Sequence, residues 1–216
     1  PFNLHHDKII KMDLKSAELT KYASNAFLAT KISYINEIAN VCEKVGANIN
    51  NVRKGICSDS RIGYDFLYPG VGFGGSCFPK DLQALKTFSK DAGYETSIID
   101  SVIKVNYRQR HIFVDKVVEF FKGKSDVCIA VWGLSFKPET DDIRESLSLK
   151  LINSISGEVK HINAFPDPIN KSFSTVFTYW IKDKLINEVS VKIDYEMKND
   201  SIINDLFSLC EKFSGE

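Results

Sequence analysis

The pattern that most restricts the fold of this chain is helical, and it runs unbroken over residues 13–45. One apolar face has members at spacings of four and three, namely Leu28, Ile32, Ile35, Ala39 and Cys42. A second apolar face lies beside it, formed by Phe27, Tyr34, Ile38, Val41 and Val45. A helix that is apolar on two sides is usually enclosed, either inside a bundle or between subunits. The pattern therefore predicts one long helix that Gly46 ends and that drives a homodimer.

Helical patterns continue through the first half of the chain. Three further helices are predicted, over residues 49–56, from Pro79 to about residue 91, and from Thr96 or Ser97 to about residue 120. A break at residues 123–126 follows the last of them. We therefore expect an all-helical central, dimerising domain over residues 1–123 that also carries the loop with Cys77.

The character of the sequence changes after this break. Residues 127–132 are apolar without interruption, which is typical of a strand buried on both faces. A turn over 133–138, a helix from Asp141 to Ile155 and a strand over 159–165 follow. This β-loop-α-β order predicts a Rossmann-like parallel α/β domain over residues 124–216, so the fold class is α/β overall. In the tail after residue 168 we expect one strand and a helix over 202–213.

Composition narrows the classes of partner. Lysine plus arginine and aspartate plus glutamate both number 28 among the 216 residues, so a nucleic-acid or acidic-membrane footprint is not indicated. No apolar run approaches the ~20 residues of a membrane span. The five cysteines are scattered and form no C-x-x-C pair, which suits a reducing, cytoplasmic setting and predicts no metal site.

The glycine-rich run over residues 70–75 sets Cys77 behind a flexible bend, just before a helix that Pro79 opens. A thiol at the start of a helix feels the positive end of the helix dipole, which makes it a better nucleophile. We interpret Cys77 as reactive, and the alternative is a small buried hydrophobe. The run also matches G-x-G-x-x-G, but residues 65–69 are too short and proline-broken for the strand that a dinucleotide fingerprint requires.

Lys21 and Asn25 lie four residues apart on the first helix, in line with Leu28. Beside a nucleophile, an ammonium and an amide would donate hydrogen bonds to a developing oxyanion, whereas the plainer interpretation is a solvated helix end. Asp81 lies four residues after Cys77, where it would position water or accept a proton. Its plainer interpretation is a first-turn aspartate that satisfies backbone amides.

Lys137 and Arg144 flank a cluster of acidic residues after the turn at 133–138. Surface ion pairing is the simplest interpretation of all these charges. The alternative is that Lys137 faces a ligand at the carboxyl end of the sheet.

Three ordered motifs resemble the UDP-glucose 6-dehydrogenase family, whose wider group includes GDP-mannose dehydrogenase. They are the runs over residues 17–29, over 72–81, and over 133–145 with its GLSFKP and TDDIRE segments. The similarity extends from about Lys8 to Pro168, and DSRIG at residues 59–63 lies between the first two motifs. The residues Phe73 and Ser76 to Phe78 resemble the UDP-glucose branch more than the GDP-mannose and UDP-N-acetylmannosamine branches.

The resemblance implies a two-step oxidation of the sugar C6 alcohol with NAD as cofactor. It makes Cys77 the nucleophile, with Lys21, Asn25 and Asp81 as its catalytic partners. It also implies substrate-binding and NAD-binding sets. UDP-glucose would contact Lys21, Asn25, Arg61, Phe66, Leu67, Tyr68, Pro69, Gly70, Gly74 and Lys137, with Arg61 reaching the neighbouring subunit's substrate. NAD would contact Lys80 and Arg144.

Two functional hypotheses remain open at this point. In the first, the chain is the central and C-terminal part of a UDP-glucose 6-dehydrogenase. In the second, it is a non-catalytic module that dimerises and retains some sugar-nucleotide binding. The family's N-terminal NAD-binding domain has no counterpart among these residues, so we expect the 216 residues alone to be inactive.

Overall fold

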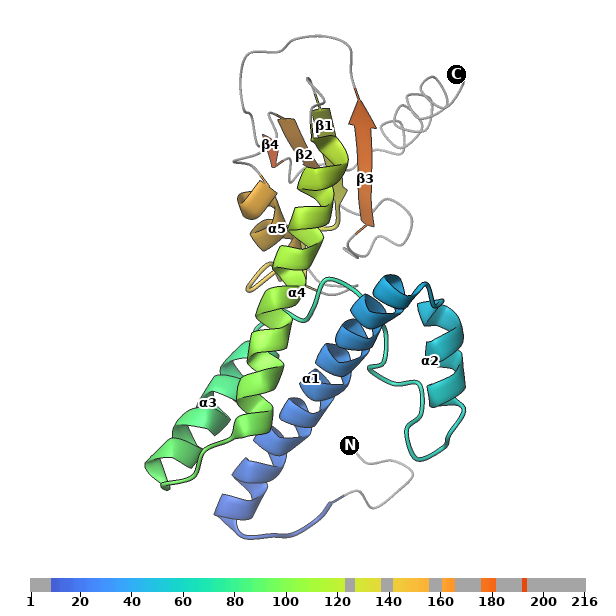
Figure 1. Cartoon of the computed structure of the whole chain (residues 1–216). Coiled ribbons are helices and arrows are strands. Elements are labelled where there is room, and N and C mark those ends of the chain that lie inside the picture. Colours follow the sequence, from blue (N-terminus) through green and yellow to red (C-terminus); the bar gives the residue numbers. More distant parts are fainter. Residues whose placement is uncertain are drawn as a thin grey trace. The chain divides into compact units, whose positions relative to one another are not determined.

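The computed structural model describes residues 9–122, 127–136, 142–155, 161–165, 176–181 and 192–193. The chain divides into two compact units. Unit 1 comprises residues 1–73 and 77–107, and unit 2 comprises residues 74–76 and 108–216. Figure 1 traces the order of elements along the chain, from helix α1 to the strands. The domain boundary predicted at residue 123 marks the change from helices to strands, whereas the two units are defined by their compactness. The predicted boundary stays a prediction.

Unit 1 is helical, as the sequence predicts. Its elements are α1 (Leu14–Val45), α2 (Ile49–Cys57), α3 (Phe78–Asp91) and the first part of α4 (Ser97–Phe121). Asp13 caps α1 by accepting the backbone N–H of Ser16 at 3.0 Å, and Gly46 ends it with a φ of 73°. The predicted starts and ends of all four helices agree with these bounds to within about two residues, because capping residues and apolar periodicity are local signals.

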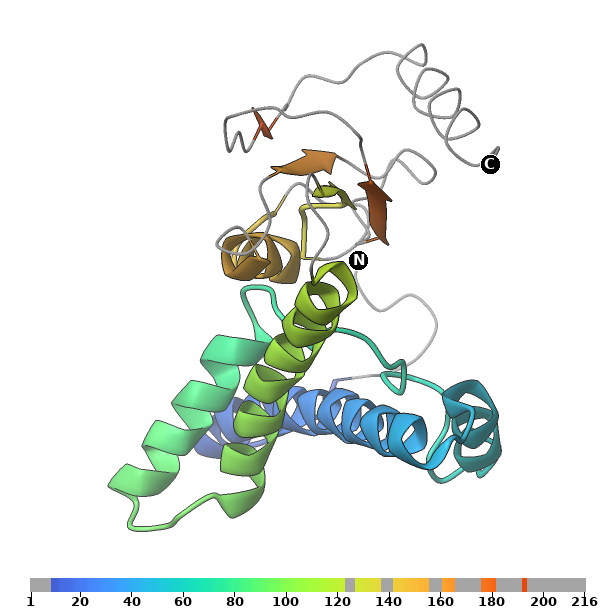
Figure 2. The same ribbon diagram turned by 45° about the horizontal axis from the view of Figure 1, so that its top comes forward.

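The core of unit 1 forms where α3 and the first half of α4 lie beside α1 (Figures 1 and 2). Its buried members are Ala26, Ala29, Phe73, Leu82 and Val102. The two alanines let the neighbouring helices approach α1 closely. The buried face predicted for α1 is therefore only partly right: Ile35 and Cys42 are buried, but the face centres on small and polar residues.

The second apolar face of α1 is exposed in the single chain. Phe27, Tyr34 and Val41, spaced seven residues apart, have 65%, 52% and 50% of their surface exposed to solvent, and Val45 has 70% exposed. Side chains of this size on one helix face leave an apolar stripe of the kind that marks interaction surfaces.

Unit 2 contains a four-stranded sheet with the order β3-β1-β2-β4. Its elements are β1 (Val127–Trp132), α5 (Leu147–Ile155), β2 (His161–Phe165), β3 (Val176–Ile181) and β4 (Lys192–Ile193). β1 and β2 pair in parallel with α5 between them in sequence, which is the predicted β-loop-α-β order. Alternate residues Ile129 and Val131 of β1 join the core of this unit with Ile152 and Ile155 of α5.

The structure corrects two expectations for unit 2. The sheet is mixed, since β3 pairs antiparallel to β1, and a single apolar strand carries no signal of its direction. The described part of the tail contains two strands, β3 and β4, where one was expected. The predicted helix at 202–213 lies outside the described residues.

Helix α5 begins at Leu147 rather than at Asp141. Glu145 has a φ of 55°, which no helix accommodates. Asp142 accepts the backbone N–H of Arg144 at 2.9 Å, while its own carbonyl accepts the N–H of Phe136 at 3.1 Å. These bonds build a turn where the sequence pattern indicates a helix.

Candidate active site

The carboxylate of Asp81 contacts three donor groups of unit 1. Lys21 Nζ lies 3.1 Å from Oδ2, Asn25 Nδ2 lies 2.6 Å from the same oxygen, and Lys80 Nζ lies 3.2 Å from Oδ1. The Asp81 side chain is only 3% exposed, whereas the Lys21 and Lys80 side chains are 60% and 71% exposed. The site thus consists of a buried carboxylate that is bound by one amide and by two ammonium groups, and the two lysine side chains that carry the ammonium groups are exposed to solvent.

Two elements far apart in sequence build this cluster. Lys21 and Asn25 stand one turn apart on α1, and Asp81 lies in the first turn of α3. Leu82, the next residue of α3, is fully buried in the core that α1 contributes to, which brings the two helices together at this point. The structure therefore brings Lys21, Asn25 and Asp81 into contact, and their joint role in catalysis stays a prediction.

Burial by itself would raise the pKa of Asp81, but the hydrogen bonds from Lys21, Asn25 and Lys80 outweigh it and hold that pKa below its usual value. A carboxylate held in this way is a weak proton acceptor. Its geometry suits a different task, which is to orient two donors: a lysine ammonium has three N–H groups and an amide nitrogen has two, so both can donate elsewhere while bound to Asp81.

Cys77 is the N-cap residue of α3, with φ −100° and ψ −62°. Its carbonyl accepts the backbone N–H of Asp81 at 2.9 Å, so the thiol and the anion are separated by one helical turn. Cys77 is exposed, whereas Cys42 and Cys57 are buried. Among the cysteines whose side chains the structure describes, Cys77 alone is accessible, as a nucleophile must be, and the buried-hydrophobe alternative is wrong for it.

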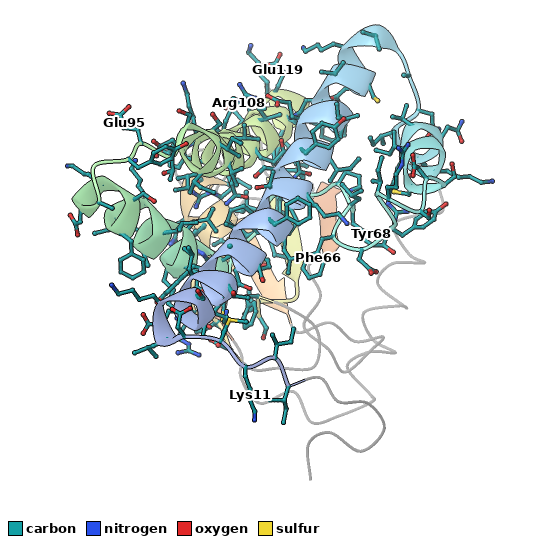
Figure 3. All side chains as sticks on the ribbon, turned by 90° about the horizontal axis from the view of Figure 1, so that it is seen from below. Lys11, Phe66, Tyr68, Glu95, Arg108 and Glu119 are labelled. Carbon is teal, nitrogen blue, oxygen red and sulfur yellow. The ribbon has the colours of Figure 1, made fainter. Side chains whose placement is uncertain are left out.

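The predicted substrate segment, residues 66–70, follows α2 and begins in a turn, where Phe66 has a φ of 62° and the N–H of Leu67 donates to the carbonyl of Tyr64 at 3.3 Å. Leu67 is 2% exposed and anchors it, while Phe66 and Tyr68 are exposed, and Figure 3 labels both side chains. The Arg53 guanidinium lies over the Tyr68 ring at 3.7 Å and 5.2 Å from the Tyr64 ring. This stacking gives the segment a fixed aromatic surface.

Other predicted residues have partners of their own. Arg61 pairs with Asp59, its Nε lying 3.0 Å and 3.1 Å from the two carboxylate oxygens, and it is 88% exposed. Arg144 pairs with Asp142 in the same two-pronged way in unit 2. Lys137 lies outside the described residues.

Gly74 belongs to unit 2, where a Cβ on it would overlap the carbonyl oxygen of Glu145. The neighbouring Gly75 donates its N–H to that same carbonyl at 3.3 Å. Glycine is therefore required at position 74 by the closeness of another backbone.

Sequence reasoning missed two buried asparagines that contact the glycine run, Asn36 on α1 and Asn106 on α4. Both are polar residues at positions that face the core, and that was the only available signal. A buried amide needs a hydrogen-bond partner, yet a single sequence does not say which one.

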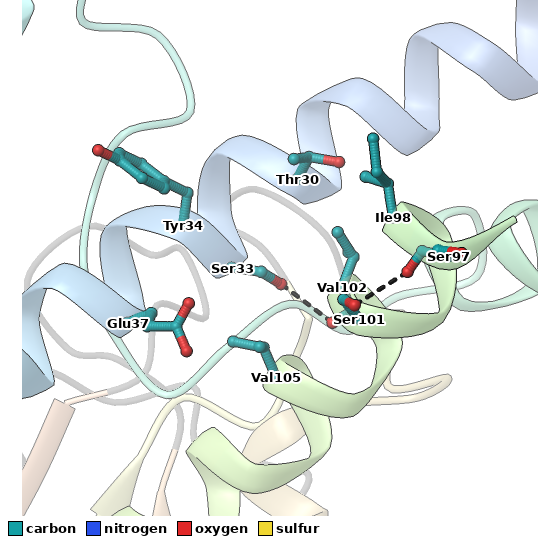
Figure 4. Close-up of a pocket in the computed structure, with 9 residues that line it drawn as sticks. All are labelled: Thr30, Ser33, Tyr34, Glu37, Ser97, Ile98, Ser101, Val102 and Val105. Atoms are coloured by element: carbon teal, nitrogen blue, oxygen red, sulfur yellow. Dashed lines mark hydrogen bonds between the residues drawn. The ribbon is translucent and has the colours of Figure 1, made fainter.

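A shallow groove of about 300 Å³ lies between α1 and α4 in unit 1 (Figure 4). Its lining includes the hydroxyl residues Thr30, Ser33, Ser97 and Ser101, and Ser33 donates to the carbonyl of Val102 at 3.2 Å. Tyr34 and Ile98, both exposed, also line it. No helix of the described residues is long and apolar enough to cross a membrane, and no three metal-ligating side chains gather among them.

Comparison with known proteins identifies the family. Residues 15–108 match the central domain of the UDP-glucose/GDP-mannose dehydrogenase family, and residues 130–195 match its UDP-binding domain. The chain belongs to this family. It spans about a third of the length of the relatives that it resembles.

Three similar proteins show the extent of the match. UDP-glucose 6-dehydrogenase TuaD of Bacillus subtilis is 49% identical over 164 residues, which is 76% of this chain and 35% of that protein. The structure of a UDP-glucose dehydrogenase from Pyrobaculum islandicum has a TM-score of 0.68 at 37% identity and covers 72% of this chain and 36% of its own. A UDP-D-ManNAc dehydrogenase from Pyrococcus horikoshii reaches 0.60 at 29% identity, with coverages of 70% and 36%.

Proposed function

We propose that this chain supplies the thiol and the sugar-nucleotide contacts of an NAD-dependent UDP-glucose 6-dehydrogenase. The observation that carries the proposal is the exposed Cys77 one helical turn from the Lys21–Asn25–Asp81 cluster. Similarity to proteins named UDP-glucose 6-dehydrogenase supports the choice of substrate. The product would be UDP-glucuronate.

In the proposed reaction, a first oxidation converts the C6 alcohol of the substrate to an aldehyde. The Cys77 sulfur then adds to the C6 carbon, and the former carbonyl oxygen takes up the proton that the thiol loses, to give a thiohemiacetal. Oxidation of that adduct yields a thioester, and water then releases the carboxylate and returns the thiol. Lys21 and Asn25 would donate to the oxygen whenever it carries negative charge. Asp81 would hold both donors in place, because its lowered pKa keeps it ionised.

NAD, when bound, supplies the hydride acceptor for each of the two oxidations. The exposed cations Lys80 and Arg144 are proposed contacts for its phosphates. Point charges do not make a dinucleotide cradle, however. Among the described residues only Gly133, with a φ of 87°, follows a strand in the manner of a fingerprint glycine.

We also propose that the chain forms a homodimer through α1. The exposed stripe of Phe27, Tyr34 and Val41 adjoins the groove between α1 and α4, so a partner helix would find both apolar side chains and a shallow depression. Self-association would also let Arg61 approach the partner's substrate, as the family resemblance implies.

The test joins the part of TuaD that precedes its central domain to residues 1–216 and follows NADH absorbance. We expect turnover with UDP-glucose that exceeds turnover with GDP-mannose or UDP-N-acetylmannosamine. Cys77→Ala should abolish acid formation, and Cys77→Ser should stall as an ester. A Cys57→Ala variant is the control. Normal turnover by Cys77→Ala contradicts the mechanism.

The chain alone is tested in parallel. We expect no NADH production from residues 1–216 with saturating UDP-glucose and NAD, and weak heat on titration with UDP-glucose. Measurable NADH production contradicts the proposed need for a further NAD-binding domain. Absence of heat, together with an inactive chimera, would favour a non-catalytic, dimerising module without sugar-nucleotide binding.

A further inference from the structure

Two buried asparagines form hydrogen bonds with the two ends of the segment Gly70–Phe73. Asn36 of α1 is fully buried, and its Oδ1 accepts the backbone N–H of Gly70 at 2.7 Å. Asn106 of α4 is 8% exposed, and its Oδ1 accepts the backbone N–H of Phe73, also at 2.7 Å. The Nδ2 of Asn106 then donates to the carbonyl of Phe73 at 3.0 Å. The amide of Asn106 thus binds both backbone polar groups of one residue, Phe73.

Neither asparagine is explained by the stability of its own helix. Asparagine is a poorer helix former than leucine, and a leucine at either position would fill the core without a polar group to satisfy. Asn36 Nδ2 is in addition buried without a hydrogen-bond partner among the described residues, which is unfavourable. What each of the two amides does provide is an acceptor for a backbone N–H, that of Gly70 or that of Phe73.

Gly72 is part of the same arrangement. Its φ of 112° is a conformation that other residues rarely adopt, and a Cβ there would lie 2.5 Å from Oδ1 of Asn106. Asn106 can therefore reach Phe73 only because position 72 has no side chain. The glycine and the asparagine are two halves of one contact.

The segment Gly70–Phe73 connects the two functional parts of the proposed site. Gly70 is the last residue of the proposed substrate segment, residues 66–70. Phe73 precedes Cys77 by four residues, and its ring lies 5.8 Å from the Phe78 ring at an interplanar angle of 90°. Because Phe78 is the first residue of α3 and follows Cys77, fixing Phe73 fixes the chain on both sides of the thiol.

We propose that Asn36 and Asn106 are positioning residues, with Asn36 setting the substrate end of the segment and Asn106 setting the thiol end. This inference rests on the proposed function. A residue that holds the thiol affects the chemical step, whereas a residue that holds the substrate segment affects binding. Loss of the two amides should therefore separate into effects on kcat and on KM.

The first experiment measures amide hydrogen exchange in residues 1–216. Asn106→Leu should speed exchange of the Phe73 amide roughly tenfold, the change expected for one lost buried hydrogen bond, and leave Gly70 unchanged. Asn36→Leu should do the reverse. Asn106→Asp keeps an acceptor for Phe73 and should retain most of the protection there. Asn51→Ala, at an exposed position of α2, is the control. Unchanged exchange at Phe73 in Asn106→Leu overturns the proposal.

The second experiment uses the active chimera. Asn106→Leu should lower kcat roughly 10–100-fold with KM changed less than about twofold, since a displaced reacting group costs about this much. Asn36→Leu should mainly raise KM, and Asn106→Asp should recover part of the lost kcat. Equal losses of kcat for all three variants would indicate a merely structural role and overturn the assignment. An inactive unsubstituted chimera contradicts the proposed function instead. Hydrogen exchange alone then tests whether Asn36 and Asn106 hold the segment Gly70–Phe73 in place.

Discussion

Replacing Asp81 by asparagine tests whether the cluster is held by an ionised carboxylate. The carboxylate is 3% exposed, so its bond from Asn25 at 2.6 Å is worth about 1.5–3 kcal/mol, as for hydrogen bonds to charged groups. The ion pairs of Asp81 with Lys21 and with Lys80 involve exposed lysine side chains, so each contributes about 0–1 kcal/mol to the free energy of unfolding. Asp81→Asn should therefore lower the free energy of unfolding by roughly 2–4 kcal/mol at pH 7.

The pH dependence has a defined sign. The pKa of Asp81 is lower in the folded chain than in the unfolded one, so its stabilisation is complete above the unfolded value of about 3.9. That stabilisation is lost as the pH falls through the folded pKa. The difference in stability between wild type and Asp81→Asn should accordingly shrink below about pH 4.

Urea unfolding followed by circular dichroism at several pH values from 7 down to 3 measures both effects. Asp91→Asn, at an exposed position on the same helix, is the matched control and should leave the midpoint almost unchanged. A loss below about 0.5 kcal/mol for Asp81→Asn, or a difference that does not depend on pH, would refute the reasoning.

Further predictions address the thiol, the donors, the glycines and the dimer. Iodoacetamide should alkylate Cys77 in the folded chain well before the two buried cysteines, as mass spectrometry would show, and equal rates would contradict its placement. Lys21→Ala should lower kcat of the chimera by ~10²–10³ with a smaller change in KM, whereas an effect on KM alone would assign it to ground-state binding. Gly74→Ala should destabilise the chain, but Gly55→Ala, which meets no atom within 4 Å, should stabilise it by about 0.4–1 kcal/mol in the same urea assay. Tyr34→Lys should shift light scattering from dimer towards monomer, and a wild-type monomer at high micromolar concentration would exclude the interface.

Several features of this protein could be predicted from sequence because their causes are local. Apolar periodicity and the caps at Asp13 and Gly46 define α1 within a few residues of each end. The glycine run and Pro79 likewise predict that Cys77 stands at the start of a helix, and the structure agrees. Motif order predicts the family, because each motif is read along one stretch of chain.

Tertiary packing decided what depends on residues far apart in sequence. The hydrogen bond between Asn25 and Asp81 joins residues 56 positions apart, and it forms only because α1 packs on α3. The grip of Asn106 on Phe73 and the antiparallel direction of β3 have the same origin. A pattern of residue types states that an amide or a strand needs a partner, whereas only the packing of distant elements determines which partner lies within hydrogen-bond reach.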